Sequence, residues 1–174
     1  MPTEIDAFEF TRAARSAEGR VHLARLGRLA TLLAVSDSEL NWRLDGWREP
    51  DPAGAERWRL RLRVSGSVGM ACGRCLGVAR LPLAIDRGFV LVSSEALAEA
   101  VDQDEEEFDA LVASRRFDIE ALIEDEAILA LPPAAAHAQC VPPARQADDA
   151  LDDPSDTQRR PFAQLASLRK KTGP

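Results

Sequence analysis

The sequence predicts an α+β protein in which an antiparallel β-sheet is packed by two or three helices. Between residues 57 and 64, arginine alternates with an apolar side chain at every second position. This period of two is typical of a strand that buries one face and wets the other. Apolar positions over 21–35 and 119–130 recur instead at spacings of three and four. That period predicts helices that pack on the sheet by one face.

The N-terminal third is expected to supply two strands and one helix. Residues 5–10 alternate apolar and polar side chains, which predicts an edge strand. The apolar spacing over 21–35 predicts a helix. Alternating apolar residues over 39–47 predict the second strand, and the proline- and glycine-containing stretch 49–54 predicts a turn.

The middle of the chain is expected to form a hairpin. The arginine-rich strand runs on into Cys72-Gly73-Arg74-Cys75, and apolar residues recur along 81–92, which predicts a returning strand. The CxxC is therefore expected at the tip of the hairpin. An acidic loop containing a short helix is expected at about 95–112. Asp118 can cap a last helix, which Pro132-Pro133 ends.

The chain is expected to form a single α+β domain over residues 1–140, followed by a tail. Residues 141–174 are rich in Pro, Asp and Ala, which predicts a mobile segment. The tail is predicted to end in a short basic amphipathic helix begun by proline. Its interleaved apolar and basic side chains favour a docking segment: Phe162, Leu165, Leu168, Arg169, Lys170 and Lys171.

Composition indicates a folded protein of a reducing compartment. The chain has 174 residues, of which 45% are hydrophobic and 29% charged, as in ordinary globular domains. Its longest apolar stretch is too short to span a bilayer, and its first residues lack the basic and apolar regions of a signal peptide, so neither secretion nor a membrane partner is expected. Three cysteines, an odd number, with two in a CxxC, do not suit a disulfide framework. A cytoplasmic location is expected.

The net charge of −7 is unevenly distributed. Residues 1–80 hold 13 arginines and 10 acidic residues, whereas residues 81–158 hold 4 and 19. Residues 159–174 hold 5 basic residues and no acid. An acidic middle between basic ends favours a charged partner without indicating a fold.

All three cysteines and one of the two histidines fall into two pairs of equal spacing. Cys72 and Cys75 form one pair, and His137 and Cys140 form the other. Together they match the halves of a Cys3His centre for a structural Zn²⁺. The 61 residues between the halves exceed the spacing in zinc fingers, so the fold must bring them together. The alternative is that these residues are reduced thiols near a turn and a loop histidine.

No other motif in the chain demands catalysis. The CxxC suits a thiol oxidoreductase poorly, because such sites begin a helix after a strand. No P-loop, GxGxxG or nucleophile motif is present, so an enzyme is not expected.

The arginine side of the 57–64 strand can bind phosphate oxygens, although a solvated sheet face is the commoner meaning of this pattern. The candidate contacts are Arg57, Arg59, Arg61 and Arg63, with Arg74 in the CxxC.

Three stretches together resemble the YceD-type family of large ribosomal RNA subunit accumulation proteins. They are Cys72–Leu76 after a strand, Asp118–Pro132 with His137 and Cys140 beyond it, and Pro161–Arg169. The resemblance implies a ribosome-biogenesis factor that supports the synthesis, processing or stability of large-subunit (23S) ribosomal RNA. It brings no catalytic residue.

Two modes of action remain open for such a factor. The protein binds pre-ribosomal RNA, or it binds a ribosome-assembly protein as a zinc-containing adaptor that never touches RNA. No DNA partner is expected.

Overall fold

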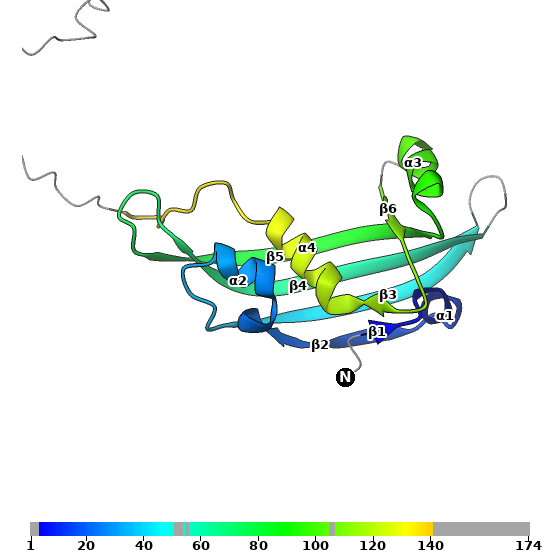
Figure 1. Ribbon diagram of the computed structural model, residues 1–174, viewed down its shortest axis with the longest axis horizontal. Helices are drawn as coiled ribbons and strands as arrows, with labels where there is room; N and C mark the ends of the chain where they lie inside the picture. Colours follow the sequence, from blue (N-terminus) through cyan, green and yellow to red (C-terminus); the bar gives the residue numbers. More distant parts are fainter. Residues whose placement is uncertain (1–3, 51–53, 55, 105–106, 141–174) are drawn as a thin grey trace, which may run out of the picture. The chain divides into compact units, whose positions relative to one another are not determined.

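The computed structural model describes residues 4–50, 54, 56–104 and 107–140. These residues form a five-stranded sheet of order β2-β3-β4-β5-β6 and a two-stranded ribbon of β1 and β7 (Figure 1). The predicted α+β class is confirmed. The elements are β1 (Glu4–Ile5), α1 (Ala7–Arg12), β2 (Ser16–His22), a 3₁₀ turn (Leu23–Arg25), α2 (Gly27–Leu32), β3 (Glu39–Pro50), β4 (Glu56–Ala71), β5 (Val78–Val92), α3 (Glu95–Asp104), β6 (Asp109–Val112), β7 (Phe117–Asp118) and α4 (Ile119–Leu129).

Strands β3, β4 and β5 are long and antiparallel, which confirms the three strands predicted over 39–47, around 57–64 and over 81–92. The last Cα pair between β4 and β5 is Ala71 with Val78. Only residues 72–77 therefore connect the two strands, which places the CxxC at the hairpin tip as expected.

One face of the sheet carries the main core. Alternate residues of the long strands are fully buried there, among them Leu40, Leu44, Leu60 and Leu62. Helices α1, α2 and α4 lie against this face (Figure 1). Helix α4 begins at the predicted cap, because the Asp118 carboxylate accepts the N–H groups of residues 120 and 121. The last helix thus follows the sequence-based expectation.

The predicted edge strand over residues 5–10 is wrong. Only the short strand β1 precedes Asp6, whose carboxylate accepts the Glu9 N–H at 3.0 Å and caps α1. Helix α1 buries Ala7, Phe10 and Thr11, which are spaced by three and four residues. Six residues are too few to distinguish this helical spacing from alternation, and tertiary packing decides in favour of the helix.

The single helix predicted over 21–35 is also wrong in extent. Residues 16–22 form β2, an edge strand paired antiparallel with β3. The remainder is divided between the 3₁₀ turn and α2. The leucines of the predicted apolar stripe do pack into the core, as Leu23, Leu26 and Leu29 are all buried.

The interval 95–112, expected to be an acidic loop with a short helix, holds more regular structure. Helix α3 covers 95–104, and β6 adds to the sheet parallel to β5. A second cluster of buried apolar residues forms here, on the face opposite the main core, around Val90, Val92, Ala98 and Phe108. Burial of Phe108 explains why this interval forms regular structure although its acidic composition predicts a loop.

Phe108 packs over Gly88 of β5, and the absence of a side chain at Gly88 makes room for it. A Cβ at Gly88 would lie 2.5 Å from Phe108 Cδ1 and 2.6 Å from Cε1. We therefore expect Gly88→Val to displace Phe108 and to lower the free energy of unfolding by about 2 kcal/mol, the usual cost of overpacking. Denaturant titration measures the change, and Gly27→Val, with nothing within 4 Å of its Cβ position, is the control for added bulk. Equal losses in both variants would contradict the prediction.

The expected tail lies outside the described residues. This applies to the whole of 141–174, including its predicted amphipathic helix, so the domain boundary at residue 140 stays a prediction. No helix formed by the described residues has the length and hydrophobicity required to cross a bilayer.

Candidate metal centre and arginine surface

The hairpin tip is a tight turn held by backbone hydrogen bonds. The Cys72 N–H donates to the Gly77 carbonyl at 2.8 Å, and the Leu76 N–H donates to the Cys72 carbonyl at 2.8 Å. The Gly73 N–H reaches outside the hairpin and donates to the Ala135 carbonyl at 2.9 Å. The tip is thereby joined to the segment that follows α4.

This junction brings the two predicted ligand pairs together. One ligand atom from each of Cys72, Cys75, His137 and Cys140 lies within 4.8 Å of all the others. Cys72 Sγ is 3.7 Å from Cys140 Sγ, and Cys75 Sγ is 3.5 Å from His137 Nδ1. The fold therefore closes the gap of 61 residues that the sequence left open.

The spacing of these atoms suits a tetrahedral metal ion. Bonds of about 2.3 Å to sulfur and about 2.0 Å to nitrogen place two sulfurs about 3.8 Å apart, and a sulfur and a nitrogen about 3.5 Å apart. The two measured separations agree with these values. The sulfur separation is also far too long for a disulfide. Three soft sulfur donors with one imidazole are the donor set of a structural zinc site.

The ring of His137 is oriented for this role by a backbone group. Its Nε2 lies 2.8 Å from the Val78 carbonyl oxygen, which can only accept a hydrogen bond. Nε2 therefore carries the proton, and Nδ1, the atom beside Cys75, presents its lone pair to the centre. Val78 is thus a supporting residue that ligand spacing alone does not indicate.

The protonation of the thiols also depends on the surrounding backbone. The pKa of Cys72 falls to about 5, chiefly because the Arg74 N–H donates to its sulfur at 3.4 Å. The pKa of Cys140 rises to about 11, because the thiol is desolvated and lies beside the other two cysteines. Without a cation the lowered pKa favours a thiolate at Cys72. A dication would release the remaining protons and hold all three sulfurs ionised.

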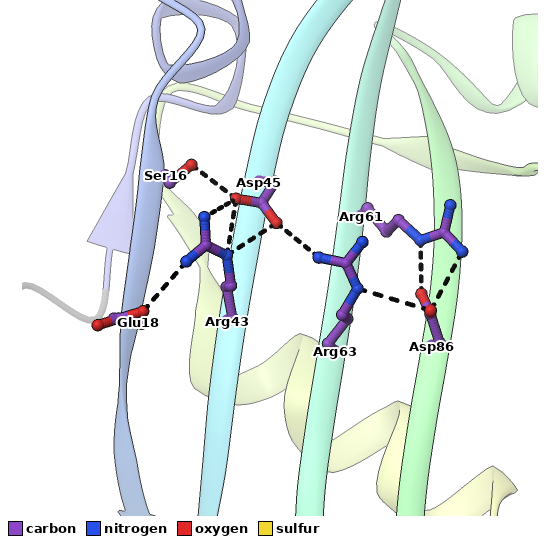
Figure 2. A network of polar contacts seen from close by, with 7 residues as sticks. All are labelled: Ser16, Glu18, Arg43, Asp45, Arg61, Arg63 and Asp86. Carbon is purple, nitrogen blue, oxygen red and sulfur yellow. Dashed lines mark hydrogen bonds and ion pairs between the residues drawn. The ribbon is translucent and has the colours of Figure 1, made fainter.

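A second polar cluster occupies the opposite face of the sheet from the main core (Figure 2). Arg61 and Asp86 form a bidentate pair, with nitrogen–oxygen distances of 2.6 and 3.1 Å. Arg63 donates to Asp45 at 2.9 Å and lies 3.6 Å from Asp86. Arg43 joins the same network through Asp45 at 3.0 Å. We call this network of Ser16, Glu18, Arg43, Asp45, Arg61, Arg63 and Asp86 the arginine surface.

Two carboxylates of the arginine surface, Asp45 and Asp86, have lowered pKa values. Hydrogen bonding from Arg43 lowers the pKa of Asp45, and hydrogen bonding from Arg61 lowers that of Asp86. Each predicted phosphate-binding guanidinium here therefore already has a carboxylate partner. A phosphate would have to displace or share Asp45 or Asp86 to bind Arg61 or Arg63.

The other two predicted arginines of β4 are placed differently. Arg59 is only 7% exposed, and its guanidinium stacks on Phe108 at 4.0 Å and donates to Glu49 at 2.8 Å. It belongs to the packing of the second apolar cluster. Arg57 is half-buried.

Arg74, the remaining predicted contact in this part of the chain, is exposed at the hairpin tip. Within the described ranges no carboxylate forms an ion pair with it. The other predicted contacts, Phe162, Leu165, Leu168, Arg169, Lys170 and Lys171, lie in the part of the chain that is not described.

Comparison with known proteins decides the family. The family described as "Large ribosomal RNA subunit accumulation protein YceD" matches residues 60–169, well over half of the chain. The chain belongs to the YceD family. The matched region holds all four candidate metal ligands together with Arg61, Arg63 and Arg74, whereas Arg57 and Arg59 precede it. No curated protein and no solved structure matches the chain.

Membership of the YceD family points to a role in the accumulation of large-subunit ribosomal RNA. The family name denotes no enzyme class. The hairpin tip also suits a thiol oxidoreductase poorly, because the thiolate-forming Cys72 has no exposed surface to offer a substrate. Its CxxC connects two strands and does not begin a helix.

Proposed function

We propose that this YceD-family protein is a cytoplasmic ribosome-biogenesis factor that supports synthesis, processing or stability of 23S ribosomal RNA by binding its precursor. The observation that carries the proposal is the family match over residues 60–169, which spans the whole Cys3His cluster. Two ligands of this cluster come from the hairpin and two from the segment after α4. A metal ion bound by the cluster would therefore join these two parts of the matched region.

The ion proposed for this cluster is a structural Zn²⁺. Four protein donors complete a tetrahedron and leave no position for substrate, which is the arrangement of structural zinc sites. The ion would fix the hairpin tip against residues 135–140, where the Gly73–Ala135 hydrogen bond is the backbone tie. Metal binding of this kind contributes directly to folding.

Charge at the hairpin end is compatible with an RNA partner. Residues 57–85 contain no acidic residue, and neither do residues 127–140, although the chain as a whole carries −7. RNA approaching this end meets no carboxylate from either segment. Electrostatic attraction to phosphates would otherwise be opposed by the net charge.

Depletion of the protein in cells is the test of this function. We expect mature large-subunit ribosomal RNA to fall relative to small-subunit RNA, with incomplete large subunits accumulating in gradient profiles. Quantifying both RNAs after depletion, and again after re-expression, measures the effect. Unchanged RNA ratios and ribosome profiles after a clean deletion would refute the proposal.

A protein-binding adaptor is the second candidate, and the arginine surface favours it. Its guanidinium groups are already paired with Asp45, Asp86 and Glu18, as in a solvated, charge-balanced surface. Crosslinking to RNA in cells separates the two candidates. An adaptor would co-purify with a ribosomal or assembly protein and give no RNA crosslinks.

A further inference from the structure

The residue after the CxxC has an unusual conformation for its type. Leu76 lies in the left-handed region, with φ of 61°. Side chains of L-residues are disfavoured there, and glycine or asparagine normally takes such positions. Gly77 follows directly, yet it is not the residue with positive φ. The tip therefore places a leucine where the backbone would prefer a glycine.

The Leu76 side chain gains no packing in return. It is 82% exposed, the largest exposure among the large apolar residues of the described chain, and it belongs to neither hydrophobic cluster. Folding of the domain thus gives no reason for a leucine here. Backbone strain combined with an exposed apolar side chain is typical of a contact residue, where binding compensates the conformational cost.

Arg74 lies two residues before Leu76 and adds a charged side chain to the same exposed turn. Most arginines in the described chain are paired with acids, whereas no described carboxylate pairs with Arg74. Its guanidinium is available for stacking on a base or for a bidentate bond to phosphate. The backbone hydrogen bonds of the tip, which join Cys72 to Gly77 and Leu76 and join Gly73 to Ala135, hold the turn, so both side chains project from a rigid support.

We propose that Arg74 and Leu76 form a contact for unpaired nucleotides of single-stranded RNA. The inference rests on the proposed function and deepens it by naming the residues that touch RNA. A centre of one dication, three thiolates and a neutral imidazole carries one formal negative charge, so attraction to phosphate at the tip is modest. Recognition then depends on Leu76 against a base face and on Arg74 beside it, which requires bases that are not stacked in a duplex.

Leu76→Gly distinguishes a binding role from a structural one. Glycine relieves the strain at positive φ, so the midpoint of thermal unfolding should stay the same or rise. Affinity for RNA should fall about tenfold, the loss expected when one buried leucine contact disappears. Leu76→Asn, which also tolerates positive φ but is polar, should lose affinity as well. Leu129→Asn is the matched control, because Leu129 is 75% exposed at the end of α4.

The probes are short single-stranded oligoribonucleotides that tile the large-subunit ribosomal RNA precursor, titrated into the full-length, zinc-loaded protein. Arg74→Ala should weaken binding and reduce the salt dependence by about one phosphate contact. Arg15→Ala, an exposed arginine on the loop before β2, should change neither. Parallel titration with duplex RNA of the same sequences should give weaker binding.

Three results would overturn this inference. In the first, Leu76→Gly and Leu76→Asn bind the oligoribonucleotides as tightly as the parent protein. In the second, they lose binding only together with zinc and thermal stability. Either result leaves the proposed function standing if depletion still lowers large-subunit RNA. Loss of a co-purifying protein with unchanged RNA binding would assign the tip to a protein partner and equally overturn the RNA contact.

Discussion

Cys72→Ser is expected to release the metal and to lower the free energy of unfolding by about 4 kcal/mol or more. Loss of a structural metal is among the few single changes with effects this large. Cys72 is completely buried, and its neighbour Gly73 carries the hydrogen bond to Ala135. Without the proposed ion, the hairpin tip and residues 135–140 would lack the ligand bonds proposed to join them.

Denaturant titration with and without a strong chelator measures this effect. The chelator should destabilise the parent protein about as much as the substitution does, and should add little to the Cys72→Ser variant. Equal unfolding curves for the parent protein with and without chelator would contradict a structural role for the metal. The prediction would also fail if the serine variant kept its metal.

Glu124→Ala is expected to be the most damaging change away from the metal, at about 3 kcal/mol. Glu124 lies on α4 and is buried, and its carboxylate accepts the N–H groups of Arg28 at 2.7 Å and Leu29 at 3.1 Å. Helix α2 has no side-chain cap of its own, since Leu26 precedes it. Removing the carboxylate leaves donors of the first turn unsatisfied.

Asp125→Ala is a matched control one residue away. Asp125 also pairs with Arg28, at 2.7 Å, but it is 53% exposed. Exposed pairs of this kind contribute less than about 1 kcal/mol. Denaturant titration of both variants should separate their free energies of unfolding clearly. Similar losses would show that the backbone cap is not the source of the effect.

The contribution of Glu124 should also depend on pH. Burial alone would raise its pKa, but hydrogen bonds from Leu29 and Arg28 outweigh it and hold the pKa below the ordinary 4.5. Its stabilisation is therefore complete above about pH 4.5 and is lost as the pH falls through the lower folded-state value. The difference in unfolding free energy between the parent protein and Glu124→Gln should shrink over that range. A difference that stayed constant down to strongly acidic pH would contradict this cause.

The sequence predicts the elements whose pattern is local and long. Strand β4 alternates over many residues, and α4 carries its own cap at Asp118. Strand β2 escapes prediction because small residues replace the apolar ones. A Cβ at Gly19 would lie 3.0 Å from the Trp42 ring, so the indole of β3 fills the space that a larger side chain on β2 would occupy. This packing depends on a contact between two strands, so it leaves no pattern in the local sequence of β2.

The candidate site likewise has features that the sequence predicts and features that depend on the fold. Spacing alone identifies the four candidate metal ligands, because two paired motifs use every cysteine in the chain. The pairing of the arginine surface depends on acids on other strands, with Asp45 and Asp86 lying 18 and 25 residues from Arg63 and Arg61. Leu76 is missed for another reason. Its left-handed backbone arises in the tight turn of the hairpin tip, and residue type alone would assign that conformation to Gly77.

The metal content of protein purified without chelators tests the centre most directly. Elemental analysis should find one zinc per chain, and X-ray absorption at the zinc edge should show three sulfur neighbours and one nitrogen neighbour, matching Cys72, Cys75, Cys140 and His137. Protein that contains no metal, with all three thiols free to react and its stability unaltered by added zinc, would contradict the account.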